Sequence, residues 1–206
     1  MEGTRDRIIS EALRLFSEKG YGEVTVSQIA EAVGIKPPSL YKHFQSKQDI
    51  FDAIKGRMSD HYMQMVSGLG IDGNDASADI PIYEGIGEDE LVQIGRSLFM
   101  FFLRDEDNSR FRRMLSIGRY SDPELDSMFH SQYIDLPLSY QSEIFRGMLE
   151  SRGMDGDPRT MALEFYSPMF ILLMSCDTDP GREEEALGMV EDHIRHFSRV
   201  NFGVIG

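Results

Sequence analysis

The chain has 206 residues and a formal net charge of −14, with 41% hydrophobic and 27% charged residues, a composition typical of a soluble globular protein. The longest strongly apolar run, residues 98–103, is far too short to span a membrane. A single cysteine, Cys176, excludes an internal disulfide, and the first residues lack the apolar core of a signal peptide. We therefore expect a cytoplasmic protein without a membrane partner.

The negative charge is distributed unevenly along the chain. Residues 1–57 contain nine Lys or Arg and eight Asp or Glu, which gives +1. Residues 58–206 contain twelve Arg, no Lys and twenty-seven Asp or Glu, which gives −15. Because salt screens charges beyond roughly 8 Å under physiological conditions, an acidic second part does not prevent a locally basic first part from binding nucleic acid.

Apolar residues at helical spacing predict four short helices before residue 60. The first ends at Gly20, and a capping-box pattern at residues 25–28 starts the second. Gly34 supplies a left-handed turn, and two prolines open a third helix over about residues 37–44. Ser46 caps the fourth. Two short helices joined by a tight glycine turn are typical of a helix-turn-helix.

The rest of the chain predicts further helices after an interruption. Glycine-rich residues 68–90 predict a long loop. Capping and stop signals then predict helices at about 90–106, 108–119, 122–153, 158–176 and 180–200. The third of these is expected to kink near Pro137. The predicted fold class is all-α with about nine helices: a three-helix helix-turn-helix domain at residues 1–48 and a helical effector-binding and dimerisation domain at residues 49–206.

The third predicted helix has one apolar side and one polar side. Leu40 and Phe44, four residues apart, face inward. Tyr41, Lys42 and His43 then face outward, where lysine and the tyrosine hydroxyl suit contacts to phosphate. A short basic helix braced by the helix before it has the geometry that enters a DNA major groove.

The pattern of residues 25–47 resembles the TetR family of transcriptional regulators. It reads Thr-Val-x-x-Ile-Ala-x-x-Val-Gly-Ile, followed by Ser-Leu-Tyr-Lys-His-Phe-x-Ser-Lys. The resemblance covers about residues 8–54 and is specific, because several unlike residues recur at fixed offsets. It implies a homodimeric regulator, in most cases a repressor, that binds a palindromic double-stranded DNA operator. It also implies a small-molecule effector bound by the C-terminal helices, the last two of which pair the subunits.

The resemblance implies DNA contacts for residues of the second, third and fourth helices. They are Thr25 at a phosphate, Tyr41, His43 and Lys47 at the DNA backbone, and Ser27, Lys36, Pro38, Ser39 and Lys42 for the remaining contacts, base reading included. The chain departs from the family at position 36, where relatives often carry a small capping residue. Lys36 has no side-chain acceptor, and Pro37 and Pro38 remove two backbone donors. We therefore expect Lys36 itself to contact a base or a phosphate.

Aromatic and methionine side chains are abundant in the second part of the chain. Each alone is most simply a core residue, but together they suit an adaptable pocket for an apolar or amphipathic effector. The candidate lining residues are Phe99, Phe102, Met114, Phe129, Tyr133, Tyr166, Met169 and Phe170.

The helices at about 158–176 and 180–200 are the predicted dimer contact. Apolar residues at helical spacing supply a seam that suits a four-helix bundle with a second copy. These residues are Ala162, Phe165, Met169, Leu172, Leu187, Val190, Ile194 and Phe197.

Other kinds of chemistry find little support in the sequence. His-Glu-x-x-His, Gly-x-Ser-x-Gly and phosphate-binding glycine loops are absent from it, so we expect neither an enzyme nor a cofactor. His193 and His196 lack an evident third ligand, so we expect no metal site. The cluster Arg110–Arg113 either pairs with Asp105–Asp107 or binds an anion. An alternative function also stays open: a small-molecule-binding or interaction module whose helix-turn-helix is vestigial.

Overall fold

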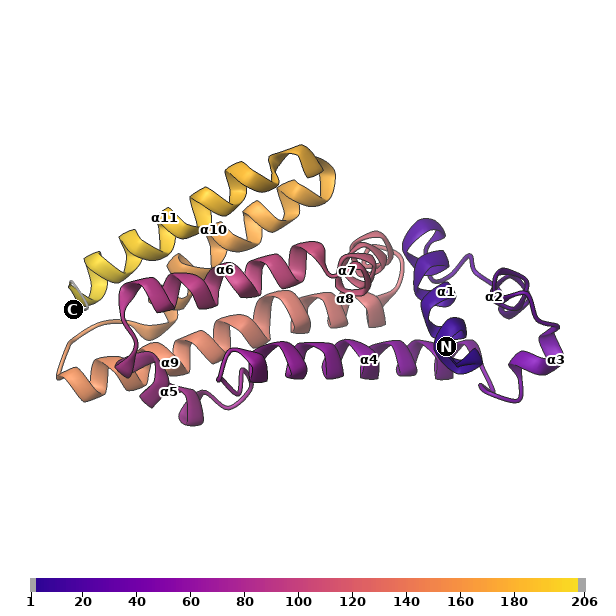
Figure 1. The fold of residues 1–206 in the computed structure, drawn as a ribbon, viewed down its shortest axis with the longest axis horizontal. Helices are drawn as coiled ribbons and strands as arrows, with labels where there is room; N and C mark the ends of the chain where they lie inside the picture. Colours follow the sequence, from indigo (N-terminus) through magenta and orange to yellow (C-terminus); the bar gives the residue numbers. More distant parts are fainter. Residues whose placement is uncertain (1–2, 204–206) are drawn as a thin grey trace. The chain divides into compact units, whose positions relative to one another are not determined.

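The computed structural model describes residues 3–203, and the regular structure of these residues is helical throughout (Figure 1). The helices are α1 Thr4–Lys19, α2 Val26–Val33, α3 Pro37–Leu40, α4 Lys47–Gly68, α5 Ala76–Gly85, α6 Glu88–Arg104, α7 Glu106–Gly118, α8 Pro123–His130, α9 Leu136–Arg152, α10 Pro158–Thr178 and α11 Glu183–Phe202. The all-α prediction is confirmed. Residues 1–2 and 204–206 of the two predicted domains lie outside the described range.

Two helical elements differ from the prediction. The predicted loop at 68–90 contains α5, because the Asp75 side chain accepts hydrogen bonds from the backbone amides of Ser77 and Ala78 and caps this helix. The helix predicted at 122–153 is divided into α8 and α9 by a π-helical turn at Ser131–Asp135, close to the expected kink. These two changes account for the helices beyond the expected number.

The chain divides into two compact units. The first is Met1–Tyr62 with Glu106–Phe129, and the second is Met63–Asp105 with His130–Gly206. Packing therefore divides the chain elsewhere than at the predicted boundary of 48/49, because α7 packs on α1 and α4 runs uninterrupted across that boundary. The predicted division of function, with DNA binding in residues 1–48 and effector binding in residues 49–206, stays a prediction.

In the first unit, α1 packs against both α2 and α7. Its core includes Ile8, Leu13, Phe16, Ile29, Leu40, Phe51, Ile54 and Met114. The Arg57 guanidinium of α4 donates to Ser10 Oγ at 2.8 Å and to the Asp6 carbonyl at 3.0 Å. It also pairs with the Asp107 carboxylate of α7 at 3.4 Å. One half-buried cation thus ties α1, α4 and α7 together, which gives the short N-terminal helices a larger body to fold against.

In the second unit, α10 packs against α9 and α11, α11 packs against α6, and α5 packs against α9 (Figure 1). Helices α6 and α11 approach closely at Gly95, where a Cβ atom would lie 2.3 Å from Ile194 Cδ1. Among the described residues, no helix is both long and apolar enough to cross a lipid bilayer.

The residues of the predicted dimer seam pack inside the second unit. Buried there are Ala162, Leu172, Leu187, Val190, Ile194 and Phe197, while Phe165 and Met169 are half-buried against the same core. These side chains are used by their own chain, so they are not available as the predicted seam. Apolar residues at helical spacing do not show whether a helix face packs on its own chain or on a second copy.

Candidate nucleic-acid interface

The turn between α2 and α3 is fixed by local signals that the sequence carries. Thr25 caps α2: its Oγ1 accepts from the Gln28 amide at 3.3 Å, and its own amide donates to Gln28 Oε1 at 2.8 Å. This is the predicted capping box. Gly34 ends α2 in the left-handed conformation, with φ 76°, which glycine adopts without steric cost. Both ends of α2 are therefore set by residues next to them in the chain.

We call residues 36–44 the recognition segment. Its helical part is shorter than predicted, since α3 ends at Leu40 and the chain continues in tight turns, with the His43 amide donating to the Leu40 carbonyl at 2.8 Å. Leu40 and Phe44 are buried, with 0% and 4% of their surface exposed, as their spacing predicts. Tyr41 is 53% exposed. The segment therefore rests on two apolar anchors and presents its polar side outward.

The predicted DNA-contacting residues are mostly on the surface. Thr25, Ser27, Lys36, Pro38, Tyr41, Lys42 and His43 are exposed, and Ser39 is half-buried. Of this set, Thr25 Oγ1 is already engaged in capping α2. The structure places these side chains at the start of α2 and along the recognition segment. Their contacts with DNA stay predictions.

Lys47 differs from the other predicted contacts because its ammonium group turns into the protein. Its Nζ donates to the carbonyl oxygens of Tyr21 at 2.8 Å and Val24 at 3.0 Å. It also lies 4.3 Å from the centre of the Tyr21 ring, and burial lowers the pKa of this ammonium below its ordinary value. Two of its three N–H groups are thus used to hold the turn that precedes Thr25. The contact of Lys47 with a phosphate stays a prediction.

One further cation, which was not predicted from the sequence, lies beside the recognition segment. The Arg5 guanidinium lies 4.9 Å from the centre of the Phe44 ring, so it is close enough for a cation–π contact. Arg5 is exposed near the start of α1. With Lys36 and Lys42 it adds positive charge to the surface around the segment. A basic residue in the first turn of α1 was the available signal, but the sequence does not show that α1 starts next to Phe44.

The predicted effector-lining residues belong to different cores. Phe99, Phe102 and Met169 pack in one cluster of the second unit. Tyr133, Tyr166 and Phe170 also belong to the second unit, where Tyr166 and Phe170 stack with their ring centres 5.9 Å apart. Met114 and Phe129 are buried and belong to the first unit. The structure therefore brings part of this set together and leaves the effector site a prediction.

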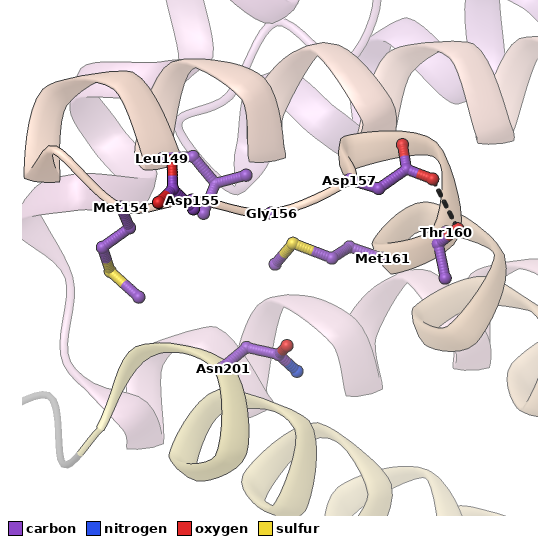
Figure 2. A pocket seen from close by; sticks show the side chains of 8 residues that line it. All are labelled: Leu149, Met154, Asp155, Gly156, Asp157, Thr160, Met161 and Asn201. Atoms are coloured by element: carbon purple, nitrogen blue, oxygen red, sulfur yellow. Dashed lines mark hydrogen bonds between the residues drawn. The ribbon is translucent and has the colours of Figure 1, made fainter.

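A cavity of about 250 Å³ opens at another place in the second unit (Figure 2). Figure 2 shows Met161 of α10 and Asn201 of α11 reaching toward the space between the two helices. Its lining residues are Leu149, Met154, Asp155, Gly156, Asp157, Thr160, Met161 and Asn201. None of them was predicted to bind an effector.

The remaining side-chain clusters are used in structure. Arg110 pairs with Glu106 on the same helix, as one of the two interpretations of that cluster predicts. Arg112 is fully buried, which a cluster on the solvated surface does not predict. His193 Nε2 lies 2.8 Å from the Phe165 carbonyl oxygen, so this ring forms a hydrogen bond inside the unit. Groups of three metal-ligating side chains do not occur among residues 3–203.

Residues 8–54 match the family model described as bacterial regulatory proteins, tetR family. Over 48 residues the chain is 52% identical to IcaR of Staphylococcus aureus, a negative transcriptional regulator of the biofilm operon icaADBC. These residues make up 23% of this chain and 26% of IcaR. The similarity to this relative therefore spans about a quarter of its length.

Solved structures extend the likeness to the whole chain. SmeT in complex with triclosan has a TM-score of 0.67 at 22% identity, covering 100% of this chain and 95% of SmeT; SmeT is the repressor of a Stenotrophomonas maltophilia multidrug efflux pump. Bacillus subtilis FadR in complex with stearoyl-CoA has a TM-score of 0.63 at 16% identity, covering 96% and 98%. At such identities the likeness concerns the fold. The match to the tetR-family model therefore covers residues 8–54, and the solved structures show that the whole chain shares their fold.

Proposed function

We propose that this protein is a sequence-specific DNA-binding transcriptional regulator, a repressor, that acts as a homodimer on a palindromic operator and responds to a small molecule. The recognition segment carries the proposal. It presents Tyr41, Lys42 and His43 to solvent while Leu40 and Phe44 fix it to the first unit. Exposed basic and hydroxyl groups on a rigid support are what phosphate contacts require.

Salt dependence tests the DNA-binding part. Binding of the full chain to DNA upstream of its own coding region should weaken steeply with salt, because each phosphate contact releases counterions. About four to eight contacts per dimer give a log–log slope of roughly −4 to −7. A flat response, or no binding to that DNA, favours the alternative of an interaction module with a vestigial helix-turn-helix.

Variants of the recognition segment separate DNA contact from folding. Tyr41→Ala and Lys42→Ala should weaken DNA binding and leave thermal unfolding unchanged, because both side chains point to solvent. Lys19→Ala, an exposed lysine at the end of α1, is the matched control and should change neither. If Tyr41→Ala and Lys42→Ala unfold the protein, these residues have a structural role instead.

The dimer contact is proposed on the solvent-facing sides of α10 and α11. Each of these helices exposes large apolar residues at helical spacing: Leu163 (53%) and Ile171 (64%) on α10, Met189 (49%) and Val200 (67%) on α11. A homodimer on a palindrome requires a self-complementary surface, and this apolar face of neighbouring helices offers one. It replaces the residues of the predicted seam, which lie in the core.

Sedimentation tests this dimer surface. Ile171→Glu combined with Val200→Glu should convert dimers to monomers, because a carboxylate buried in an apolar interface is strongly unfavourable. Leu136→Glu, at a leucine of α9 that is 56% exposed, should leave the dimer intact. Dimers that persist in the double variant would place the interface elsewhere.

The effector is proposed to be apolar or amphipathic and to bind in the second unit. SmeT and FadR have been captured with triclosan and stearoyl-CoA, and the Phe99, Phe102 and Met169 cluster here offers soft aromatic and thioether surface. Helix α4 passes from the first unit into the second after Tyr62, so it connects a bound effector to the DNA-binding unit. Compounds that raise the thermal unfolding temperature of the protein are taken as bound effectors. Such compounds should change the affinity for the operator by at least about fivefold. Binding with unchanged operator affinity would contradict a ligand-responsive mechanism.

A further inference from the structure

The opening of the recognition segment lacks hydrogen-bond donors on its main chain. Pro37 and Pro38 have no N–H group. The amides of Ser39 and Leu40 donate to the Lys36 carbonyl at 2.8 and 3.4 Å, and the Tyr41 amide donates to the Pro37 carbonyl at 3.2 Å. Each amide of residues 37–41 is therefore either missing or already bonded within the segment, so this stretch has no free amide to donate to DNA.

The same stretch presents apolar rings to solvent. Pro37 and Pro38 are both exposed, and Tyr41 is 53% exposed. Tyr41 follows the two prolines by four and three residues, a spacing that places side chains on one side of a helical turn. Lys36 and Lys42, both exposed, flank this surface. The first turn of the recognition segment thus exposes two proline rings within an otherwise polar surface, with Lys36 and Lys42 beside them.

Major-groove chemistry limits what exposed proline rings can read. Guanine, cytosine and adenine present hydrogen-bonding groups there, whereas thymine adds a methyl group at C5. A proline ring placed against a polar base edge displaces water without replacing its hydrogen bonds, which is unfavourable. Against a thymine methyl, the same ring buries apolar surface on both sides. A·T pairs with the methyl group toward the prolines are the favourable partners.

We propose that the Pro37–Pro38 ring pair reads thymine methyl groups in each operator half-site, while Lys36 and Lys42 hold the segment to flanking phosphates or guanines. This inference rests on the proposed DNA-binding function and deepens it. It assigns specificity to methyl contact within the stretch where base reading is predicted from the sequence. The competing explanation is that the prolines only stiffen the start of α3, since proline suits the first turn of a helix.

Thymine-to-deoxyuridine replacement tests the proposal, because it removes the methyl group and keeps every base-pairing and groove hydrogen bond. Duplexes are first selected from a randomised library with the full chain, and the enriched half-sites are remade with deoxyuridine at each thymine in turn. One contacted methyl should be worth about fourfold in affinity. If a sequence is enriched but its affinity does not change with deoxyuridine at any thymine, the methyl-reading proposal is overturned. Failure to enrich any sequence contradicts the proposed function itself.

Single proline variants then assign the contact. In Pro37→Ala or Pro38→Ala the deoxyuridine penalty at the contacted thymine should fall from about fourfold toward none, because the ring that covers the methyl is gone. Alanine is the best helix former, and both sites are exposed, so both variants should fold. Lys42→Ala is the control: it should weaken binding and keep the full penalty. A penalty that persists in both proline variants means that another side chain reads the methyl, and it overturns the assignment.

Discussion

Each of the two units holds a loop in place with one charged side chain, but the two charges differ in sign and in access to water. In the first unit, the half-buried Lys47 ammonium donates to the carbonyls of Tyr21 and Val24. In the second unit, the Asp79 carboxylate is 1% exposed and accepts from the backbone amides that follow α4. The cation sits beside the candidate DNA surface, whereas the anion lies deep in a core.

The Asp79 site is the more completely bonded of the two. Its carboxylate accepts from the Asp72 amide at 2.7 Å, the Gly73 amide at 2.8 Å and the Tyr140 hydroxyl at 2.6 Å. Burial raises the pKa of Tyr140 above its ordinary value, so this hydroxyl stays protonated and donates. The buried Asp79 thus has a structural role, whereas the half-buried Lys47 keeps partial access to solvent beside the predicted DNA contacts.

The largest expected effect is the loss of the buried anion. Asp79→Ala removes the buried acceptor of two amides and one hydroxyl, and each such group left without a partner in the protein interior costs about 1–3 kcal/mol. We expect a loss of about 3 kcal/mol in the free energy of unfolding, measured by denaturant titration. Asp72→Ala is the matched control, because the exposed Asp72 carboxylate accepts from the amides of Asn74 and Asp75 and water can replace it. Equal losses in both variants would show that burial does not decide the effect.

The second prediction concerns the cation and separates its two roles. Lys47→Met keeps the apolar stem, removes the donor to the Tyr21 and Val24 carbonyls, and should cost about 1.5 kcal/mol of stability. It should also weaken DNA binding, because Thr25 follows the turn that Lys47 holds. Lys42→Met should weaken DNA binding alone, since its side chain is exposed. Denaturant titration measures the stability of both variants, and electrophoretic mobility shift assays measure their DNA binding. Unchanged stability in Lys47→Met would mean that this lysine acts only on DNA.

The sequence predicts the recognition segment because its signals are local. The capping residue Thr25, the left-handed Gly34 and the four-residue spacing of Leu40 and Phe44 each act on neighbours in the chain, so the outward direction of Tyr41 follows from the sequence. These features need no knowledge of the rest of the fold.

The remaining features depend on contacts between residues far apart in the chain. Helix α5 forms in a glycine-rich stretch where Asp79 bonds with Tyr140, which is 61 residues away. The sequence does not distinguish Lys47 from an ordinary surface lysine, because its acceptors Tyr21 and Val24 lie more than twenty residues away in the chain. Arg112 lies in an apparently solvated arginine cluster and is fully buried. The aromatic residues predicted to line one effector site divide between two units, because composition reveals apolar surface and not which core contains it.

A neutral hydrogen bond of the second unit should have a smaller effect on stability than the two charged side chains. The Tyr166 hydroxyl donates at 2.8 Å to the Tyr133 carbonyl, which lies in the π-helical turn at Ser131–Asp135, where regular helical bonding is interrupted. Tyr166→Phe should therefore cost about 1 kcal/mol in the free energy of unfolding. Tyr120→Phe, at a tyrosine that is 88% exposed, should cost nothing measurable by the same titration. No loss in Tyr166→Phe would show that the π-turn does not depend on this donor.

The smallest expected effect is a pH dependence from an ion-pair cluster in which Glu88 is half-buried and Arg199 is exposed. Hydrogen bonds from Arg199, and then Arg195, lower the pKa of Glu88 below its ordinary value of 4.5. A carboxylate with a lowered folded-state pKa adds stability above its unfolded-state pKa, and this contribution is lost as the pH falls through the folded-state value. Glu88→Gln should therefore reduce stability at neutral pH and flatten its decline below about pH 4.5, measured by thermal unfolding across pH. Glu150→Gln, at an exposed glutamate of α9, should leave the profile unchanged. Because high salt screens ion pairs in which one partner is exposed, as Arg199 is here, the Glu88 effect should shrink in salt. The Asp79 effect should persist, because that carboxylate is buried.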